Sequence, residues 1–454
     1  MPLKWFPCPD PSAPAAEPPC SAAARKRRPS AAFLRRKRWN GRNCTAWKRR
    51  RGLLFYLFSA REAVNISDQE RIYYFDNAAT SWPKPEEVYL SAEKFLRHIG
   101  GNPGRSGHAR SLEADRLVYR TRSLLARFFN APDPSCIVFT LNATDALNLA
   151  IKGLVEPGDH VIFTAMEHNS VLRPLGGLRR SGTISTTMVP CDREGFPDLD
   201  FLERSFQRRT RLVICNHASN VSGTILPVEE ICRLAHAHGA HFLLDAAQTA
   251  GVLPLDVAAA QFDLLAFAGH KSLLGPPGTG GLYVRPGLEL KPWREGGTGS
   301  HSEQDLHPET MPERLEAGTL NGPGLAGLEA GVSFIESVGL ENICRHERQL
   351  RAYLKKRLQE LPGVRVYGPE KEEQCVAVLS FTVEGIDCGE LGHILENSYG
   401  ILCRTGLHCA PLAHKAIGTY PQGTVRLSPG YFNTAAEVDY LAGALEEIIA
   451  LAAN

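Results

Sequence analysis

Short apolar runs alternate with longer amphipathic stretches through the middle of this chain. Buried strands are predicted for five apolar runs, at residues 136–140, 160–165, 212–215, 241–244 and 264–268. The stretches between them with helical spacing lie at residues 144–154, 170–180 and 228–238. Strands and helices in alternation predict an α/β protein whose large domain is a doubly wound, mostly parallel sheet.

Glycine and proline divide the chain after this region. Segments rich in both lie at residues 275–281, 296–299 and 318–324, and an amphipathic stretch at 325–361 predicts a long or broken linker helix. Strands are then expected at residues 364–367, 376–383, 401–404 and 424–427, with helices at 389–398 and after Asn433. We therefore expect a large domain at residues 71–330, and a linker helix with a small C-terminal α/β domain at 331–454.

The first seventy residues differ from the rest in composition. Residues 1–60 carry 14 Lys or Arg and two acidic side chains, a net charge of +12, and have no sustained apolar period. Such a composition cannot build a core. We expect residues 1–70 to be a basic, Pro-, Ala- and Arg-rich extension that is disordered or not part of the working protein. An organellar presequence and translation upstream of the true start are the alternatives.

The remaining chain has the composition of a globular protein. It holds 37 basic and 47 acidic side chains, a net charge of −10, which gives no reason to expect nucleic-acid binding by the folded part. No stretch approaches the roughly 18 apolar residues that a membrane span needs. The 12 cysteines are scattered without regular spacing, so most should be reduced core residues. We therefore expect a cytoplasmic protein.

Candidate chemistry lies at the ends of predicted strands. Lys271 follows the run 264–268 and precedes glycines that let a backbone approach a ligand, so it could anchor a cofactor as a Schiff base. A surface lysine is the commoner alternative. Asp245 ends another strand, at the edge where open α/β sheets bind ligands, and could pair with the pyridinium nitrogen of a pyridoxal ring. Gln248 could then donate to the phenolic oxygen of the ring.

Two further strand ends carry weaker signals. Ala143 and Thr144 stand where a strand turns into a helix, and backbone N–H groups there could hold a phosphate. The same residues also make an ordinary N-cap. His168 follows the run 160–165, where an imidazole could stack on a cofactor ring or could be structural.

Seven motifs taken together resemble class V aminotransferase-fold cysteine desulfurases. In family order from about residue 72, they are Asp76-Asn77-Ala78-Ala79-Thr80, Glu167-His168-Asn169, His217-Ala218-Ser219-Asn220-Val221-Ser222-Gly223, Asp245-Ala246-Ala247-Gln248, Gly269-His270-Lys271, Glu316-Ala317-Gly318-Thr319 and Arg404-Thr405-Gly406-Leu407-His408-Cys409. The last motif is similar to the SufS- and CsdA-like (group II) branch, which also includes selenocysteine lyases.

The resemblance implies a pyridoxal 5'-phosphate enzyme of fold type I that forms a homodimer with active sites at the subunit interface. Lys271 matches the lysine that carries the cofactor, and His168 matches the ring-stacking acid or base. The other positions that match cofactor contacts are Asp245 for the pyridinium, Gln248 for the phenolate, Ala143, Thr144 and His270 for the phosphate, Asn220, and Thr319 from the other subunit.

On the substrate side, Arg426 matches the arginine that binds the amino-acid carboxylate, with Asn220 assisting; a guanidinium suits this bidentate task. His108 and Arg404 match residues that line the substrate. Cys409 matches the nucleophile, and positive charge from Arg404, Arg426 and His408 would favour its thiolate.

The implied reaction converts L-cysteine to L-alanine and leaves the sulfur as a persulfide on Cys409, for iron–sulfur cluster assembly or another pathway with a sulfur-acceptor protein. Two departures stand out. Ala268 replaces a serine that usually contacts the phosphate, and residues 410–414 after the nucleophile leave the acceptor unidentified.

Three alternatives stay open. The first is a selenocysteine lyase acting on L-selenocysteine. The second is a metal-binding or regulatory module built on Cys403, His408, Cys409 and His414, although their spacing suits zinc poorly. The third is a silent scaffold that recruits nucleic acid through the basic extension. The intact set of candidate catalytic side chains argues against this last alternative.

Overall fold

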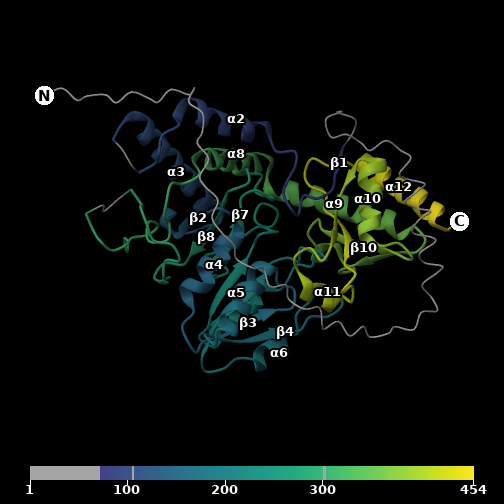
Figure 1. Cartoon of the computed structure of the whole chain (residues 1–454), viewed down its shortest axis with the longest axis horizontal. Helices are drawn as coiled ribbons and strands as arrows, with labels where there is room; N and C mark the ends of the chain where they lie inside the picture. The colour runs from purple at the N-terminus through teal and green to yellow at the C-terminus, as the bar shows by residue number, and fades with distance from the viewer. Residues whose placement is uncertain (1–71, 105–106, 300–302, 454) are drawn as a thin grey trace, which may run out of the picture. The chain divides into compact units, whose positions relative to one another are not determined.

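A computed structural model describes residues 72–104, 107–299 and 303–453, all within the unit Arg50–Asn454 (Figure 1). The predicted extension at residues 1–70 lies outside the described residues. Strands and helices alternate from β2 to β7, as the apolar pattern predicts.

The larger sheet has seven strands in the order β2-β8-β7-β6-β5-β3-β4. Their bounds are β2 Ile137–Thr140, β3 His160–Thr164, β4 Ser185–Val189, β5 Thr210–Asn216, β6 His241–Asp245, β7 Leu264–Ala268 and β8 Gly280–Val284. The pairs from β4 through β7 are parallel, whereas β8 runs antiparallel to both of its neighbours. The predicted mostly parallel α/β sheet is therefore confirmed.

The five predicted strands in this sheet are all present, within two residues at each end. The strands β4 and β8 were not predicted from the apolar pattern. The strand β8 begins inside the glycine-rich segment at 275–281, where Gly281 has no room for a side chain because a Cβ would lie 2.4 Å from the Phe267 ring. β4 is a half-exposed edge strand, so it lacks the continuous apolar run of the buried strands.

Helices cover both faces of the sheet because successive strand residues alternate in direction. Val161 faces the cluster built with α4 (Ala143–Leu154) and α5 (Asn169–Arg180). Ile162 faces the cluster built with α3 (Ala109–Phe128), α7 (Val228–Ala237) and α8 (Gly322–Val338). Two apolar cores of this kind fix the sheet rigidly and so fix the side chains at its edge.

The predicted linker helix is broken into α8 and α9 (Leu340–Gln359) at Gly339, whose φ of 89° falls in the left-handed region that favours glycine. After α9 a four-stranded antiparallel sheet follows, in the order β12-β13-β10-β9. Its strands are β9 Val364–Tyr367, β10 Leu379–Val383, β12 Arg404–Gly406 and β13 Thr424–Leu427.

Helices α9, α10 (Cys388–Tyr399) and α12 (Ala435–Ala453) gather around the smaller sheet and share its apolar cluster (Figure 1). The start of the described chain joins this part. β1 (Tyr73–Tyr74) pairs in parallel with β11 (Ile401–Leu402), and Asp76 bridges to Ser428. Residues 73–76 therefore lie against the C-terminal strands although they come first in the sequence.

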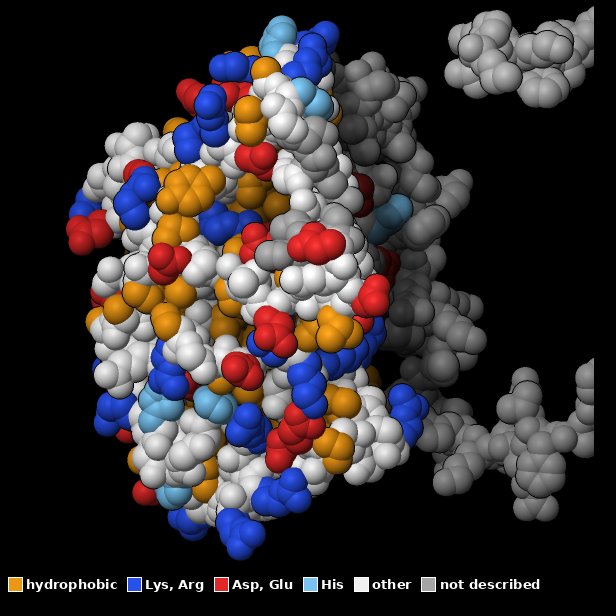
Figure 2. Space-filling model, turned by 90° about the vertical axis from the view of Figure 1, so that its left-hand side faces the viewer, with side chains coloured by type: hydrophobic (Ala, Val, Ile, Leu, Met, Phe, Trp, Pro, Cys, Tyr) orange, Lys and Arg blue, Asp and Glu red, His pale blue; other side chains and the backbone are white. Residues whose placement is uncertain are grey.

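On the described surface drawn in Figure 2, Lys and Arg side chains are interspersed with Asp and Glu, and apolar side chains lie between them. Large exposed apolar side chains come from α2 (Glu86–Lys94), the π-helix η1 (Phe95–Ile99) and α3: Tyr89, Leu90, Leu96, Leu112 and Tyr119. Among the described residues, no helix combines the length and apolar character that a membrane span requires.

Candidate active site

A cavity lies at the edge of the larger sheet where the parallel strands end. The strands β3, β5, β6 and β7 end at this edge, so the residues that follow them converge on one space. Of the predicted site residues, the following line it: Ala143, Thr144, His168, Asn220, Asp245, Gln248, His270 and Lys271. The structure thus brings together eight positions that are spread over 129 residues of sequence.

The cavity holds a buried amine and a buried carboxylate. Burial lowers the pKa of Lys271 to about 8, although the Asp245 carboxylate favours the charged amine. Burial also raises the pKa of Asp245, whose Oδ1 accepts a hydrogen bond of 2.9 Å from the backbone N–H of Ala247. Gly269 leads into Lys271, and a Cβ on it would lie 2.3 Å from Thr279 Oγ1, so glycine is required there.

A chain of hydrogen bonds fixes the ring of His168. Its Nδ1 accepts from the backbone N–H of Ser170 (3.1 Å) and lies 2.8 Å from Ser170 Oγ, which lies 2.8 Å from Thr144 Oγ1. A ring nitrogen that accepts from a backbone N–H carries no proton, so the proton of the neutral ring is assigned to Nε2. Burial, together with the charge of Lys271, lowers the pKa of His168 to about 4, which keeps the ring neutral.

Ser170 is a site residue that the sequence analysis missed. It lines the cavity, is buried, and links His168 to Thr144. Its place three positions after the acidic residue of the Glu167-His168-Asn169 motif gave a weak signal, because a serine near a helix start is also an ordinary cap.

The segment after Asp76 is hydrogen-bonded to two residues that line the cavity, His270 and Gln248. Thr80 Oγ1 donates to the carbonyl oxygen of His270 (3.0 Å), and Lys84 Nζ donates to the same oxygen (3.2 Å). Burial lowers the pKa of Lys84 to about 8 and that of His270 to about 4. Gln248 Nε2 donates to the carbonyl oxygen of Ala78 (3.1 Å), so one of its amide hydrogens is held by this segment.

Beneath the cavity lies Glu167, which is fully buried. Its Oε1 accepts from Thr164 Oγ1 (2.7 Å) and from the backbone N–H of Asn216 (3.0 Å), so it ties the end of β3 to the end of β5. Its Oε2 has no hydrogen-bond partner. Burial, together with the charge of the neighbouring Asp245, raises the pKa of Glu167 to about 8. Glu167 is therefore a neutral acid at neutral pH.

The Cys409 loop, defined as residues 407–410, joins β12 to α11 (Pro411–Ile417) and is bonded to Asn220 of the cavity lining. The backbone N–H of Asn169 donates to the carbonyl oxygen of Cys409 (2.7 Å), and Asn220 Nδ2 donates to that of His408 (2.8 Å). His408 and Cys409 have φ values of 47° and 58°, which few non-glycine residues adopt. Two bonds from residues that follow β3 and β5 thus hold a strained loop in place.

Cys409 differs from the other eight cysteines in the described part of the chain, because it alone is exposed. Arg404 Nη2 lies 3.4 Å from its Sγ, within hydrogen-bonding distance for sulfur. By contrast, burial raises the pKa of Cys403 to about 12 and that of Cys215 well above its usual range. Cys215 is therefore a core residue, and Cys403 is half-buried against the apolar cluster of the smaller sheet.

Arg426 stands opposite Arg404 on the neighbouring strand and is fully buried. Its Nη1 donates to the carbonyl oxygen of Asn220 (3.1 Å), and its Nη2 makes an ion pair of 2.5 Å with Asp76 Oδ1. It therefore lies directly behind Asn220, a residue that lines the cavity.

Two predicted site residues lie elsewhere in this chain. Thr319 is exposed and lines a separate cavity with Leu141 and Arg294. His108 is exposed and serves as the N-cap of α3, where its Nδ1 accepts from the backbone N–H of Ser111 (3.2 Å). Neither side chain lines the cavity that contains Lys271, and neither do those of Arg404, Cys409 and Arg426.

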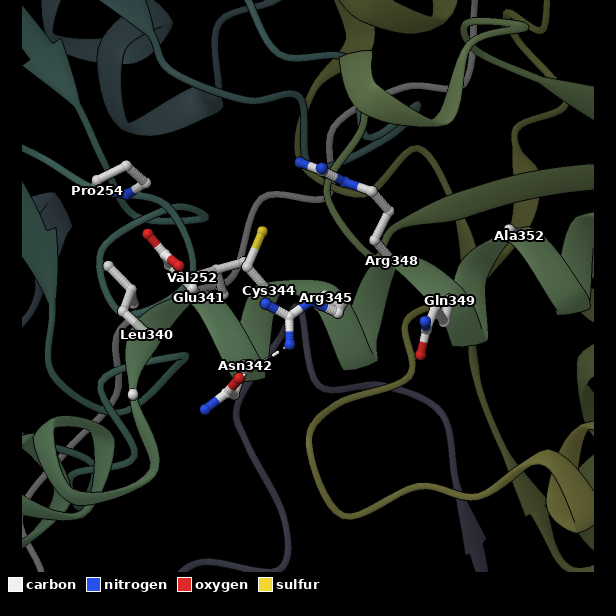
Figure 3. A pocket seen from close by; sticks show the side chains of 11 residues that line it. Val252, Pro254, Leu340, Glu341, Asn342, Cys344, Arg345, Arg348, Gln349 and Ala352 are labelled. Carbon is white, nitrogen blue, oxygen red and sulfur yellow. Dashed lines mark hydrogen bonds between the residues drawn. The ribbon is translucent and has the colours of Figure 1, made fainter.

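A larger cavity of about 720 Å³ lies at the start of α9 and contains none of the predicted site residues (Figure 3). Cys344 and Arg348 project from the helix toward the same side, and Arg345 turns toward Asn342. No three His, Cys, Asp or Glu side chains of the described residues are grouped as a metal site. In the four-residue set proposed for metal, His408 and His414 instead pair with Thr424 and Thr419.

The amino-acid sequence of this chain is similar to those of known proteins. Residues 73–441 match the family Aminotransferase class-V. A probable cysteine desulfurase of Methanothermobacter thermautotrophicus is 35% identical over 384 residues, which cover 83% of this chain and 95% of the relative. A cysteine desulfurase of Shigella sonnei is 36% identical over 386 residues, which cover 83% of this chain and 93% of that protein.

Solved structures agree with these sequence matches. The apo cysteine desulfurase of Thermococcus onnurineus NA1 gives a TM-score of 0.78 at 35% identity and covers 84% of this chain and 95% of its own. The cysteine desulfurase CsdA of Escherichia coli, in its S-sulfonic acid form, gives 0.77 at 29% identity and covers 87% of this chain and 98% of its own.

Proposed function

This chain belongs to the class V aminotransferase family, and from that premise we propose that it is a pyridoxal-phosphate-dependent cysteine desulfurase of the CsdA-like kind. It converts L-cysteine to L-alanine and retains the sulfur. The observation that carries the proposal is the bond from Asn220, which lines the Lys271 cavity, to the loop of the exposed Cys409. We infer from this bond that the cofactor site and the free thiol act on one substrate.

The residues of the cavity fit pyridoxal 5'-phosphate. Asp245 offers a carboxylate to a protonated ring nitrogen, Lys271 offers an amine for a Schiff base, and the N-terminus of α4 offers backbone N–H groups to a phosphate. The cofactor supplies an electron sink for the bonds broken on the substrate. We assign the following residues to hold it: Lys271, Asp245, Gln248, His168, Ala143, Thr144, His270 and Asn220.

Proton transfer falls to Lys271. A pKa of about 8 lets this amine both take and return a proton near neutral pH, as a general acid or base requires. The neutral His168, with its proton on Nε2, is held rigidly through Ser170 and can donate to a neighbouring group without gaining charge. We assign Arg426, Asn220 and Arg404 to the substrate, with Arg426 on its carboxylate.

Sulfur transfer falls to Cys409. Its thiolate attacks the sulfur of L-cysteine, a new S–S bond forms, and the C–S bond breaks. The sulfur is oxidised to the sulfane level while the β-carbon is reduced to the methyl group of L-alanine, so no external oxidant or reductant is needed. The guanidinium of Arg404 stabilises the attacking thiolate. Because Cys409 is exposed, a second protein can collect the sulfur for iron–sulfur cluster assembly or another pathway.

The test compares Cys409→Ala with a matched control, Cys403→Ala, in which a half-buried thiol six residues away is removed. Cys409→Ala should keep the visible absorbance of the bound cofactor while alanine production from L-cysteine falls at least about 100-fold. Cys403→Ala should stay near wild type. A Cys409→Ala variant that desulfurates L-cysteine like wild type would refute the mechanism.

L-selenocysteine separates the alternative activity. Its selenol is more acidic and its C–Se bond weaker, so Cys409→Ala should retain turnover of this substrate. We expect wild type to act on both substrates and to show a persulfide on Cys409 by mass spectrometry after one turnover of L-cysteine. If wild type turns over only L-selenocysteine, the protein is a selenocysteine lyase.

We also propose a homodimer. Leu112 and Tyr119 lie seven residues apart on α3, and both are exposed, as are large apolar side chains of α2 and η1. Thr319 lies outside its own Lys271 cavity, which fits a contact with the cavity of a partner. Tyr119→Asp should shift the mass measured by light scattering toward the monomer, whereas Tyr440→Asp, at an exposed residue of α12, should not.

Finally, we propose that residues 71–330 and 331–454 form the working protein, that residues 1–70 are dispensable, and that the protein is cytoplasmic. Nine free cysteines among the described residues support a reducing compartment. A variant that starts at residue 71 should keep cofactor absorbance and turnover. Aggregation or loss of cofactor on truncation would show that the extension is needed.

A further inference from the structure

Arg426 already holds a carboxylate before any substrate arrives. Its side chain is fully buried, and its Nη2 donates to Asp76 Oδ1 at 2.5 Å. The pairing is built into the backbone, because the N–H of Asn77 donates to the carbonyl oxygen of Ser428 and the N–H of Ala78 to the hydroxyl of the same residue. Asp76 is therefore anchored beside the end of the strand that carries Arg426.

The existing hydrogen bonds of the Arg426 guanidinium limit which of its nitrogens can bind a second carboxylate. A guanidinium offers two edges with paired donors, Nε with Nη2 and Nη1 with Nη2, and both include Nη2. Nη1 is held by Asn220, and Nε is buried without a partner. A substrate carboxylate on either edge would share Nη2 with the Asp76 carboxylate. Two negative charges on the same nitrogen repel each other.

We propose that Asp76 is a built-in competitor of the substrate carboxylate for Arg426, so that it sets the affinity of the enzyme for amino acids. The inference rests on the proposed role of Arg426 on the substrate. Asp76 acts through Arg426 and is a positioning residue. Its side chain is 22% exposed, so it can turn toward solvent when an amino acid enters.

This arrangement gives Asp76 two opposite effects. In the free enzyme it neutralises a buried guanidinium, whose charge would otherwise be unpaired. During binding it must be displaced, and the displacement weakens the capture of every ligand that carries a carboxylate. A ligand without a carboxylate does not meet Arg426 in this way and should be indifferent to Asp76.

The experiment measures the binding of L-alanine and of cysteamine to the holoenzyme by the change in cofactor absorbance. L-alanine carries a carboxylate, and cysteamine is L-cysteine without one. Asp76→Asn should bind L-alanine about ten-fold more tightly than wild type, while cysteamine binding changes less than two-fold. The KM for L-cysteine should fall with kcat nearly unchanged.

A matched ion pair provides the control. Arg351 is also fully buried, and its Nη1 pairs at 2.5 Å with Glu372, whose side chain is 23% exposed. Glu372→Gln should lower stability as Asp76→Asn does but leave L-alanine binding unchanged. Asp76→Glu, which restores a carboxylate, should return the affinity toward wild type. If Asp76→Asn does not fold, Asp76→Ser removes the same charge.

The outcomes separate this inference from the proposed function. Weaker or unchanged L-alanine binding in Asp76→Asn and Asp76→Ser would overturn the competition. Arg426→Lys should weaken L-alanine binding whatever Asp76 does. If Arg426→Lys leaves that binding unchanged, the assignment of Arg426 to the substrate is wrong; if it weakens binding while removal of the Asp76 charge has no effect, only the competition is wrong.

Discussion

The Lys271 cavity and the Cys409 loop give their reactive groups opposite environments within one proposed site. In the cavity, ionisable groups are taken out of water: burial lowers the pKa of Lys271 and raises that of Asp245, and His168 is kept neutral. In the loop, the thiol is placed in water, on a backbone whose two consecutive residues have positive φ. The cavity rests on the rigid edge of a parallel sheet, whereas the loop depends on two hydrogen bonds from that edge.

The difference follows from what each part must do. Proton transfer at an amino-acid carbon needs pKa values near neutrality, which burial provides. Sulfur delivery needs a nucleophile that a second molecule can reach, which burial would prevent. Backbone strain in the loop then costs on the order of 1 kcal/mol or more per residue and persists because bonds to Asn169 and Asn220 hold it. Changes in the cavity should therefore affect every substrate, and changes in the loop only L-cysteine.

The largest effect should come from Lys271→Ala. Without the amine no Schiff base forms, so the visible absorbance of the protein and its turnover of both L-cysteine and L-selenocysteine should vanish, a loss of at least about 10⁴-fold. Absorbance spectra before and after borohydride, with alanine assays, measure it. The control Lys355→Ala removes a buried lysine of the C-terminal part that pairs with Glu370 and Glu372, and should keep both properties.

Asp245→Asn should have the next largest effect. An amide cannot keep a pyridinium charged, so the rate with both substrates should fall about 100-fold while some cofactor stays bound. Asp263→Asn is the matched control, because Asp263 is a fully buried carboxylate of the same sheet that pairs with His236 and Arg285. It should lose stability but keep its activity per bound cofactor. Equal losses in the two variants would mean that Asp245 acts only in folding.

Much of this contrast could be predicted from the sequence, because it depends on local patterns. The five apolar runs predicted five of the seven strands but not their order in the sheet. Asp245, His168 and Lys271 each follow one of these runs, so their meeting at one edge is a consequence of parallel pairing. The motif order then connected them to a family whose members carry the same chemistry.

The remaining contacts depend on residues far apart in sequence. The bond from Asn220 to His408 spans 188 residues and that from Arg426 to Asp76 spans 350, and no local pattern indicates either. Ser170 and Lys84 sit in short polar or proline-containing segments whose ordinary roles are caps and turns. The strand β8 was hidden because its glycines are required by close packing and carry no apolar pattern.

A smaller effect should come from Asn220→Ala, which weakens the connection between cavity and loop. The main-chain oxygen that accepts from Arg426 is retained, but the amide that donates to His408 is lost. Alanine production from L-cysteine should fall about ten-fold because the loop is less well held, and L-selenocysteine turnover should fall less. Steady-state assays with both substrates decide this, and an equal loss for both would place Asn220 in the cavity function alone.

The smallest effect on activity should come from Glu167→Gln. At pH 7 wild-type Glu167 is already neutral, because burial raises its pKa to about 8, so an amide of the same shape should change kcat less than about two-fold. Glu167→Ala, which removes the acceptor shared by Thr164 and Asn216, should cost about 2 kcal/mol of stability.

The pH dependence of stability tests the reason for that small effect. An acid whose pKa is higher in the folded than in the unfolded state binds more protons when folded, so its contribution to stability falls as pH rises from about 4.5 to about 8. Glu167→Gln cannot titrate and should lack this term. The unfolding free energies of variant and wild type are measured by denaturant titration at pH 5 and at pH 8. Between these two pH values, the variant should gain a few kcal/mol of stability relative to wild type. If the difference in unfolding free energy between variant and wild type does not change with pH, Glu167 is ionised in the folded protein. A buried carboxylate, rather than a neutral acid, would then lie beneath the cavity.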